Sequence, residues 1–163
     1  MTTVPRPIKG TIGSRIRLIF GNTGKNWLLV LDNDNGDSIW QTHDWKGIYT
    51  KVANQMNNCS NKGRHVKEVD FGPSGSWFIN GIKADGTGEH SWWGDTKASS
   101  QIKQWNGNNS LRLQVSFGAD FFGDETWALL QGDNCHWFSS NAPPGLKKRV
   151  SKLYGQNKRI NYM

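Results

Sequence analysis

Apolar and polar residues alternate along several short runs of this chain, and each run ends at a glycine-bearing turn. In the run 66–71, Val69 and Phe71 fall on one side and Glu68 and Asp70 on the other. This period of two is typical of a half-buried β-strand. Two further apolar runs follow across short turns, so the stretch 66–93 predicts a three-stranded antiparallel meander.

The same order of features occurs three times. Each copy has a Phe-Gly that closes the first run, a turn glycine, a Trp that leads the second run and a Trp in the third run. The closing Phe residues are separated by about 50 residues: Phe20, Phe71 and Phe117. The Trp residues of the third run are Trp40, Trp92 and Trp137. A fixed period of this length indicates a repeat architecture, and we expect copies at about 11–58, 64–106 and 109–155 with short terminal arms.

Behind the third run of each copy the hydrophobic period changes to that of a helix, over 46–56, 99–105 and 146–154. The loop 57–64 is expected to join the first two copies, and Pro143 or Pro144 suits the start of the last helix. The chain is therefore predicted to be mainly β with short helices, built of three β-β-β-(α) repeats.

A lone three-stranded sheet buries too little apolar surface to be stable. We therefore expect one domain, residues 1–163, in which the three copies pack about a pseudo-threefold axis. Sequence leaves open whether the closure is propeller-like or trefoil-like. The Trp residues that lead the second runs are expected in the shared core: Trp27, Trp77 and Trp127.

Charge adds a candidate partner. The chain has twenty Lys and Arg residues and thirteen Asp and Glu residues, which gives a net charge of +7. Such an excess favours approach to polyanions such as RNA, although solubility alone also explains it. Basic residues gather near the C-terminus: Lys147, Lys148, Arg149, Lys152, Lys158 and Arg159.

The two cysteines, Cys59 and Cys135, are too few for a disulfide framework and are expected to be free thiols. No apolar run resembles a signal peptide or a membrane span, so a cytoplasmic location is expected. The four histidines lack ligand spacing, and no phosphate-binding loop, dinucleotide fingerprint or hydrolase nucleophile motif occurs. No metal or cofactor is therefore expected.

One dense group of polar and aromatic residues lies in the third run of the second copy. A carboxylate and an imidazole there can serve as general acid and base on a phosphodiester or glycosidic bond. The candidate catalytic residues are Glu89, His90 and Asp95, with Trp92 and Trp93 for substrate binding. A surface strand end is the alternative interpretation.

Further substrate-binding candidates combine rings that stack with guanidinium groups that bind phosphates. They are Trp40, Trp137, Arg15, Arg17 and Arg112. For the basic helix, a solvated surface is the competing explanation.

The unit FG-x-x-G-[SN]-W-x-[LFI], followed by a Gly turn and a Trp strand, resembles repeats found in small fungal proteins and covers most of the chain. The basic, Trp-rich character also resembles the cytosolic defence proteins of mushrooms, of which the edodin-like ribosome-inactivating type is the nearest. That resemblance implies removal of an adenine from large-subunit rRNA, which requires stacking of a flipped base and an acid to assist its departure. It assigns no residue, because no motif of that class is matched.

Two functions of different classes follow. The first is a toxin-like protein that acts on or binds RNA or the ribosome, as an rRNA N-glycosylase or a ribonuclease. The second is a glycan-binding lectin with one aromatic site per repeat. A lectin predicts Trp40, Trp92 and Trp137 at equivalent, partly exposed positions, whereas an RNA-acting enzyme predicts one asymmetric cleft beside basic residues.

Overall fold

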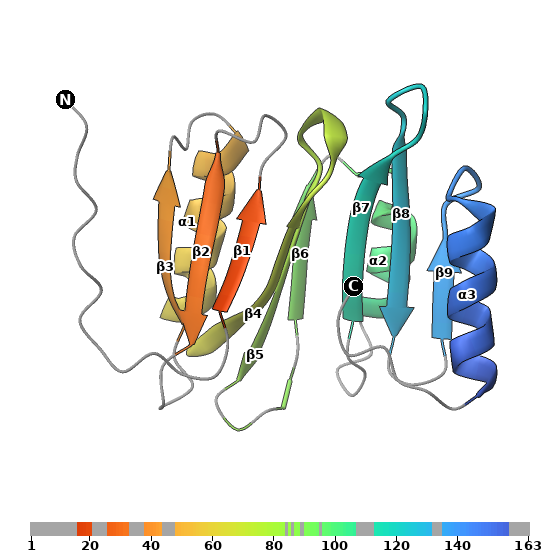
Figure 1. Cartoon of the computed structure of the whole chain (residues 1–163). Coiled ribbons are helices and arrows are strands. Elements are labelled where there is room, and N and C mark those ends of the chain that lie inside the picture. The colour runs from red at the N-terminus through yellow and green to blue at the C-terminus, as the bar shows by residue number, and fades with distance from the viewer. Residues whose placement is uncertain are drawn as a thin grey trace.

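The computed structural model describes residues 16–20, 26–32, 38–43, 48–83, 85, 87–88, 90–94, 96–106, 113–131 and 135–156. These residues form nine strands and three α-helices (Figure 1). The strands are β1 (Ile16–Phe20), β2 (Trp27–Asp32), β3 (Ser38–His43), β4 (Arg64–Phe71), β5 (Trp77–Lys83), β6 (His90–Gly94), β7 (Leu113–Ala119), β8 (Glu125–Gln131) and β9 (Cys135–Phe138). The helices are α1 (Ile48–Asn61), α2 (Ser99–Asn106) and α3 (Pro144–Gly155), and a short 3-10 turn spans Pro73–Gly75.

The strands make three antiparallel sheets of three strands each. Their orders are β1-β2-β3, β4-β5-β6 and β7-β8-β9, and a helix follows each sheet along the chain. The prediction of a mainly β fold with short helices is confirmed. The last helix starts at Pro144, where the missing N–H of proline costs no hydrogen bond.

One cross-strand pair occurs at the same place in every sheet. The Phe that closes the first strand lies directly opposite the Trp that leads the second: Phe20 and Trp27, Phe71 and Trp77, Phe117 and Trp127. We call the side of each sheet that carries this pair its aromatic face, and the other side its reverse face. Alternation of side chains along a strand assigns every other residue to one of the two faces.

Two apolar clusters hold the three sheets together. The first joins the reverse face of the first sheet to α1 and to the aromatic face of the second sheet: Leu28, Val30, Val52, Met56, Cys59, Val66, Val69 and Ile79. The second joins the reverse face of the second sheet to α2 and to the aromatic face of the third: Phe78, Ala98, Ile102, Leu113, Val115 and Leu129. As predicted, Trp77 packs against the first cluster and Trp127 against the second.

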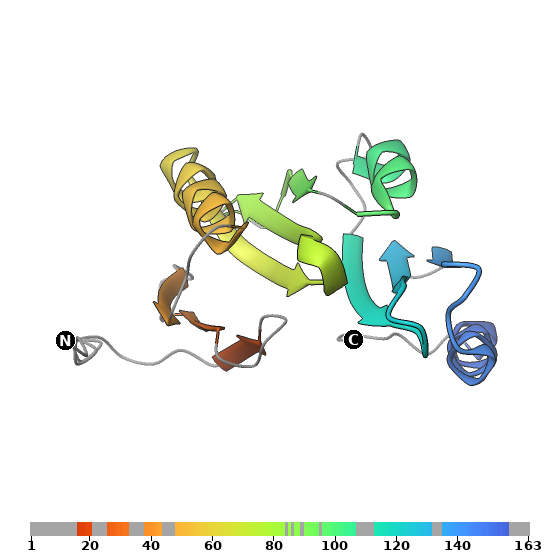
Figure 2. The ribbon, with the colours of Figure 1, turned by 90° about the horizontal axis from the view of Figure 1, so that it is seen from above.

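The second sheet therefore stands between the other two, as the views from the side and from above show (Figures 1 and 2). A closed propeller is not seen within the described part of the chain. None of the described helices is long and apolar enough to cross a membrane.

The prediction of a loop over 57–64 is wrong for residues 57–61, because α1 continues to Asn61. Cys59 extends the buried stripe of Val52 and Met56 by one turn, and this packing outweighs the poor helix propensity of Asn and Ser. The helix ends where Gly63 adopts a φ of 66° and its N–H is bonded to Ser60 O. Burial raises the pKa of the Cys59 thiol to about 11, against the opposing charges of Arg64 and Lys62, so this cysteine is a packing residue.

The glycine of the second Phe-Gly unit has a steric reason. A Cβ on Gly72 would lie 2.5 Å from Ser76 Oγ and 3.0 Å from the Cβ of Phe117 on the third sheet. Both distances are shorter than a normal contact. The φ of Gly72 is −105°, which any residue adopts. Glycine is therefore required here by the closeness of Ser76 Oγ and of the next sheet, and not by backbone conformation.

We predict that Gly72→Ala lowers the free energy of unfolding by about 1–3 kcal/mol, the usual cost of overpacking. Gly145→Ala is the matched control, because its Cβ meets nothing within 4 Å in the first turn of α3. It should be neutral or stabilise by up to about 1 kcal/mol through helix propensity. Urea unfolding followed by tryptophan fluorescence measures both, and equal stabilities of the two variants would contradict the steric account.

Candidate functional site

A cleft of about 200 Å³ opens where the first strands of the three sheets approach one another. Its walls come from β1, β4 and β7: Leu18, Ile19, Phe20, Glu68, Val69, Asp70 and Val115. The cleft combines apolar side chains with two carboxylates and contains no basic residue, so it does not match the basic cleft predicted for an RNA-acting enzyme.

The two carboxylates bridge the second and third sheets. Glu68 and Asp70 are two residues apart on β4 and therefore point to the same side. Glu68 Oε1 accepts a hydrogen bond from the N–H of Val115 at 3.1 Å, and Asp70 Oδ2 accepts one from the N–H of Phe117 at 2.8 Å. Among the described residues, β7 pairs with β8 alone, so these carboxylates satisfy amides on its other edge.

Asp70 is a titratable group of this cleft with a strongly shifted pKa. Burial raises the pKa of the carboxyl from 3.8 to about 6, and the N–H groups of Phe117 and Phe71 oppose the rise. The Phe71 N–H lies 2.9 Å from Oδ1, so each carboxylate oxygen accepts one amide. A carboxyl that titrates near pH 6 can exchange a proton under mild conditions, but here both oxygens already hold the backbone.

The predicted catalytic group is represented by His90 alone, since Glu89 and Asp95 lie outside the described residues. His90 lies edge-on to Trp92, with ring centroids 4.7 Å apart. Burial, followed by the charges of Arg64 and Lys62, lowers the pKa of its imidazole below 6.5. The ring is therefore neutral at pH 7 and can accept a proton.

Trp92 and Trp93 point to opposite faces of the second sheet. Trp92 packs against the first core cluster and Trp93 against the second. Both rings are partly buried between sheets, so they contribute to the packing of the fold as well as to any site.

The third-strand Trp residues do not occupy equivalent register positions. Trp92 lies opposite Ile79 and Trp137 opposite Leu129, each two residues after the Trp that leads the second strand, whereas Trp40 lies opposite Val30, three residues after Trp27. Trp137 is half-exposed. The side chains of Trp40 and Arg17, and all of Arg15 and Arg112, lie outside what the structure describes.

Helix α3 presents a cationic surface. It contains no acidic residue, and Lys148, Arg149 and Lys152 are exposed while Val150 is buried. His136 on β9 lies 3.1 Å from Ser151 Oγ and packs on Tyr154 at 4.9 Å, so it helps fix the helix to the sheet. His136 thus positions α3, which the sequence did not indicate.

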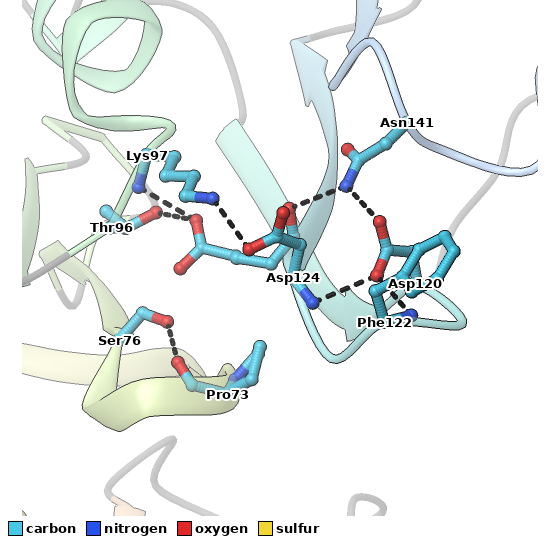
Figure 3. Close-up of polar contacts among 9 residues, drawn as sticks. Pro73, Ser76, Thr96, Lys97, Asp120, Phe122, Asp124 and Asn141 are labelled. Carbon is cyan, nitrogen blue, oxygen red and sulfur yellow. Dashed lines mark hydrogen bonds and ion pairs between the residues drawn. The ribbon is translucent and has the colours of Figure 1, made fainter.

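Two phenylalanines project from the β7–β8 hairpin next to this helix. Phe121 is 96 % exposed and Phe122 89 %, with their rings edge to face at 5.5 Å. Asp120 fixes the turn by accepting the N–H groups of Phe122 and Asp124 on Oδ1, both at 2.9 Å (Figure 3).

The hairpin and the helix are held together by the segment between β9 and α3. The side-chain amide of Asn141 donates to Asp120 Oδ2 at 2.9 Å, and Lys147 Nζ donates to Ser140 O at 2.8 Å. On the other side of the hairpin, Oε1 of the buried Glu125 accepts hydrogen bonds from the hydroxyl of Thr96 at 2.7 Å and from the N–H of Lys97 at 2.8 Å (Figure 3). The exposed rings therefore stand on a braced loop beside α3.

Sequence reasoning missed the hairpin phenylalanines and the bridging carboxylates. An adjacent pair of apolar residues inside a polar turn was the available signal for Phe121 and Phe122.

Among the described residues, no group of three or more His, Cys, Asp or Glu is placed to hold a metal ion. Comparisons with family models, curated proteins and solved structures match nothing to this chain.

The raised pKa of Asp70 predicts a pH dependence of stability. The folded protein binds the proton of Asp70 more tightly than the unfolded chain does. The contribution of this proton to the free energy of unfolding is therefore fully present below pH 3.8 and is lost as the pH rises through about 6. A shift of this size corresponds to at most about 3 kcal/mol. Asp70→Asn should remove this decline between pH 4 and 6.

Chemical unfolding at a series of pH values measures that slope. Asp85→Asn is the control, because Thr87 lowers the pKa of this exposed carboxyl below 3.8 and its titration lies beneath the window. A slope that stays the same in Asp70→Asn and in the wild type would show that Asp70 does not carry the proton.

Proposed function

We propose that this protein binds single-stranded RNA through a surface made of the β7–β8 hairpin tip and α3, here called the hairpin–α3 surface: Phe121, Phe122, Lys148, Arg149 and Lys152. The observation that carries the proposal is the placement of two almost fully exposed aromatic rings beside a helix that has only basic charges. Single-stranded nucleic acids are bound by this combination of rings that stack on bases and cations that follow the phosphates.

The two parts have different tasks in this proposal. Lys148, Arg149 and Lys152 contact phosphates and supply salt-dependent affinity by releasing counterions. Phe121 and Phe122 offer ring faces to unpaired bases, which gives preference for single strands over duplexes. The Asp120 and Asn141 hydrogen bonds hold the backbone of the hairpin turn in place before RNA arrives, so little entropy is lost in ordering that backbone.

Action on ribosomal RNA is the more specific form of this proposal. A neutral His90 is suited to accept a proton, and the catalytic group predicted around it would act on RNA held by the hairpin–α3 surface. Depurination of ribosomes that is lost in His90→Ala, with RNA binding retained, supports this form.

A glycan-binding lectin receives less support. Three equivalent aromatic sites require three equivalent Trp positions, and Trp40 is displaced by one residue relative to Trp92 and Trp137. Of the third-strand Trp side chains that the structure describes, that of Trp137 is half-exposed on β9 and offers a ring for stacking. A glycan array tests this alternative, in which binding should be lost in Trp137→Ala.

We also propose that the three sheets are copies of one β-β-β-α module. The recurring Phe–Trp pair supports this, as does the order of reverse face, helix and aromatic face in both core clusters. Successive modules would then be related by similar rotations, as in repeat proteins that stack units against their neighbours.

Neutralising charges on α3 is predicted to weaken RNA binding and its salt dependence. In Lys148→Gln/Arg149→Gln, the plot of log affinity against log salt should lose a slope of about 1.4, since each contact with a single strand contributes about 0.7. Lys51→Gln/Lys103→Gln removes the same charge from exposed positions on α1 and α2 and is the matched control. Fluorescence anisotropy with a labelled oligonucleotide at several salt concentrations measures both.

Equal losses in the two double variants would mean that net charge alone, and not α3, attracts RNA. Binding to vesicles of anionic phospholipid without binding to RNA would replace the proposed partner with a membrane surface, since exposed rings beside cations also suit that partner.

Removing the exposed rings is predicted to reduce affinity without changing the salt slope. Phe121→Ser/Phe122→Ser should weaken binding to a single strand by about 1–3 kcal/mol for each stacked base and leave weak duplex binding unchanged. Because both side chains are exposed, thermal unfolding should be unaffected. Unchanged affinity for single strands would exclude the rings from the binding site.

A further inference from the structure

We propose that the aromatic face of the first sheet is the docking site for a second copy of this chain, which contributes the reverse face of its third sheet together with α3. The inference rests on the proposed repeat and is independent of RNA binding. Within the chain, two contacts between successive sheets join a reverse face and its helix to the aromatic face of the next sheet. The first sheet offers an aromatic face of this kind, and the third sheet offers a reverse face with a helix.

Equivalent residues on the three aromatic faces differ sharply in exposure. Val69 is 5 % and Val115 1 % exposed, because the preceding sheet and helix cover them. The residue in the same register position of the first sheet is Leu18, which is 53 % exposed. Phe20, the partner of Trp27, is 58 % exposed, whereas Phe71 and Phe117 are half-buried against core clusters.

In both internal contacts the aromatic face is covered by a group of the same kinds of element, a reverse face and a helix. On the aromatic face of the second sheet this group consists of the reverse face of the first sheet and α1. On the aromatic face of the third sheet it consists of the reverse face of the second sheet and α2. Among the described residues no sheet precedes the first, and its aromatic face has no such group against it.

The other end of the series supplies the missing group. The reverse face of the third sheet carries Ala128 and Leu130, both buried. Helix α3 meets this face through His136, which lies opposite Leu130 and contacts Ser151 and Tyr154. No fourth sheet follows within the described residues. Leu146, one turn before Val150, remains exposed on α3. A helix and a reverse face are thus present without the aromatic face that α1 and α2 each contact.

Continuity with the internal contacts therefore selects a second copy as the occupant. The cleft lined by Leu18, Ile19 and Phe20 continues this face into the first contact between sheets. The interface is heterologous, with one end of one copy against the other end of the next. Such an interface closes into a ring if the rotation allows and otherwise extends as a chain.

Three variants test the proposal. Phe20→Lys alters the aromatic face of the first sheet, Leu146→Lys alters the α3 end, and Gln104→Lys places the same charge at an exposed position on α2, outside both halves. Sedimentation velocity over a wide range of concentration should show self-association of the wild type and of Gln104→Lys. Each of the other two should weaken association at least about tenfold, as expected for an anchor residue in an interface.

Mixing Phe20→Lys with Leu146→Lys provides the decisive readout, because one intact contact remains possible between the two variants. We expect the mixture to form a heterodimer at concentrations at which neither variant associates alone. Circular dichroism verifies that both are folded. A wild type that is monomeric at every concentration would overturn the proposal, and association that Leu146→Lys leaves intact would overturn its head-to-tail form. RNA binding by the monomeric variants separates this result from the proposed function.

Discussion

The contact between β4 and β7 is the constraint on which the arrangement of the second and third sheets depends. Glu68 and Asp70 present two carboxylates at the spacing of alternate amides on the β7 edge, and they accept the N–H groups of Val115 and Phe117. Apolar packing behind them is non-directional. The two hydrogen bonds therefore set the position of one sheet along the other, and Gly72 allows the close approach of Phe117.

Alternation and the recurring Phe-Gly and Trp were enough to predict three meanders, because strand faces and turns are encoded locally. The end of α1 was missed for the opposite reason: Cys59 becomes helical through packing on another sheet, which outweighs the local preference of Asn and Ser for a turn. The roles of Glu68 and Asp70 were equally beyond prediction. An alternating acidic position on a strand is expected to face solvent until a neighbouring sheet edge is known.

The site residues show the same limit. Trp92 and Trp93 were chosen for their density, yet both contribute to cores between sheets. The most exposed aromatic rings of the described residues, Phe121 and Phe122, lie in the β7–β8 turn, whose backbone Asp120 and Asn141 brace beside α3. The net charge of +7 predicts either a polyanionic partner or solubility alone, and α3 places Lys148, Arg149 and Lys152 together on one exposed surface.

Amide hydrogen exchange measured by NMR tests the β4–β7 contact most directly. The N–H groups of Val115 and Phe117 point away from β8, toward an edge with no neighbouring strand among the described residues. If the carboxylates of Glu68 and Asp70 hold them, both amides should exchange slowly in the wild type, and Glu68→Ala should accelerate exchange at Val115 more than at Phe117. Rapid exchange of both amides in the wild type would contradict the account, because the two sheets would then lack their directional link.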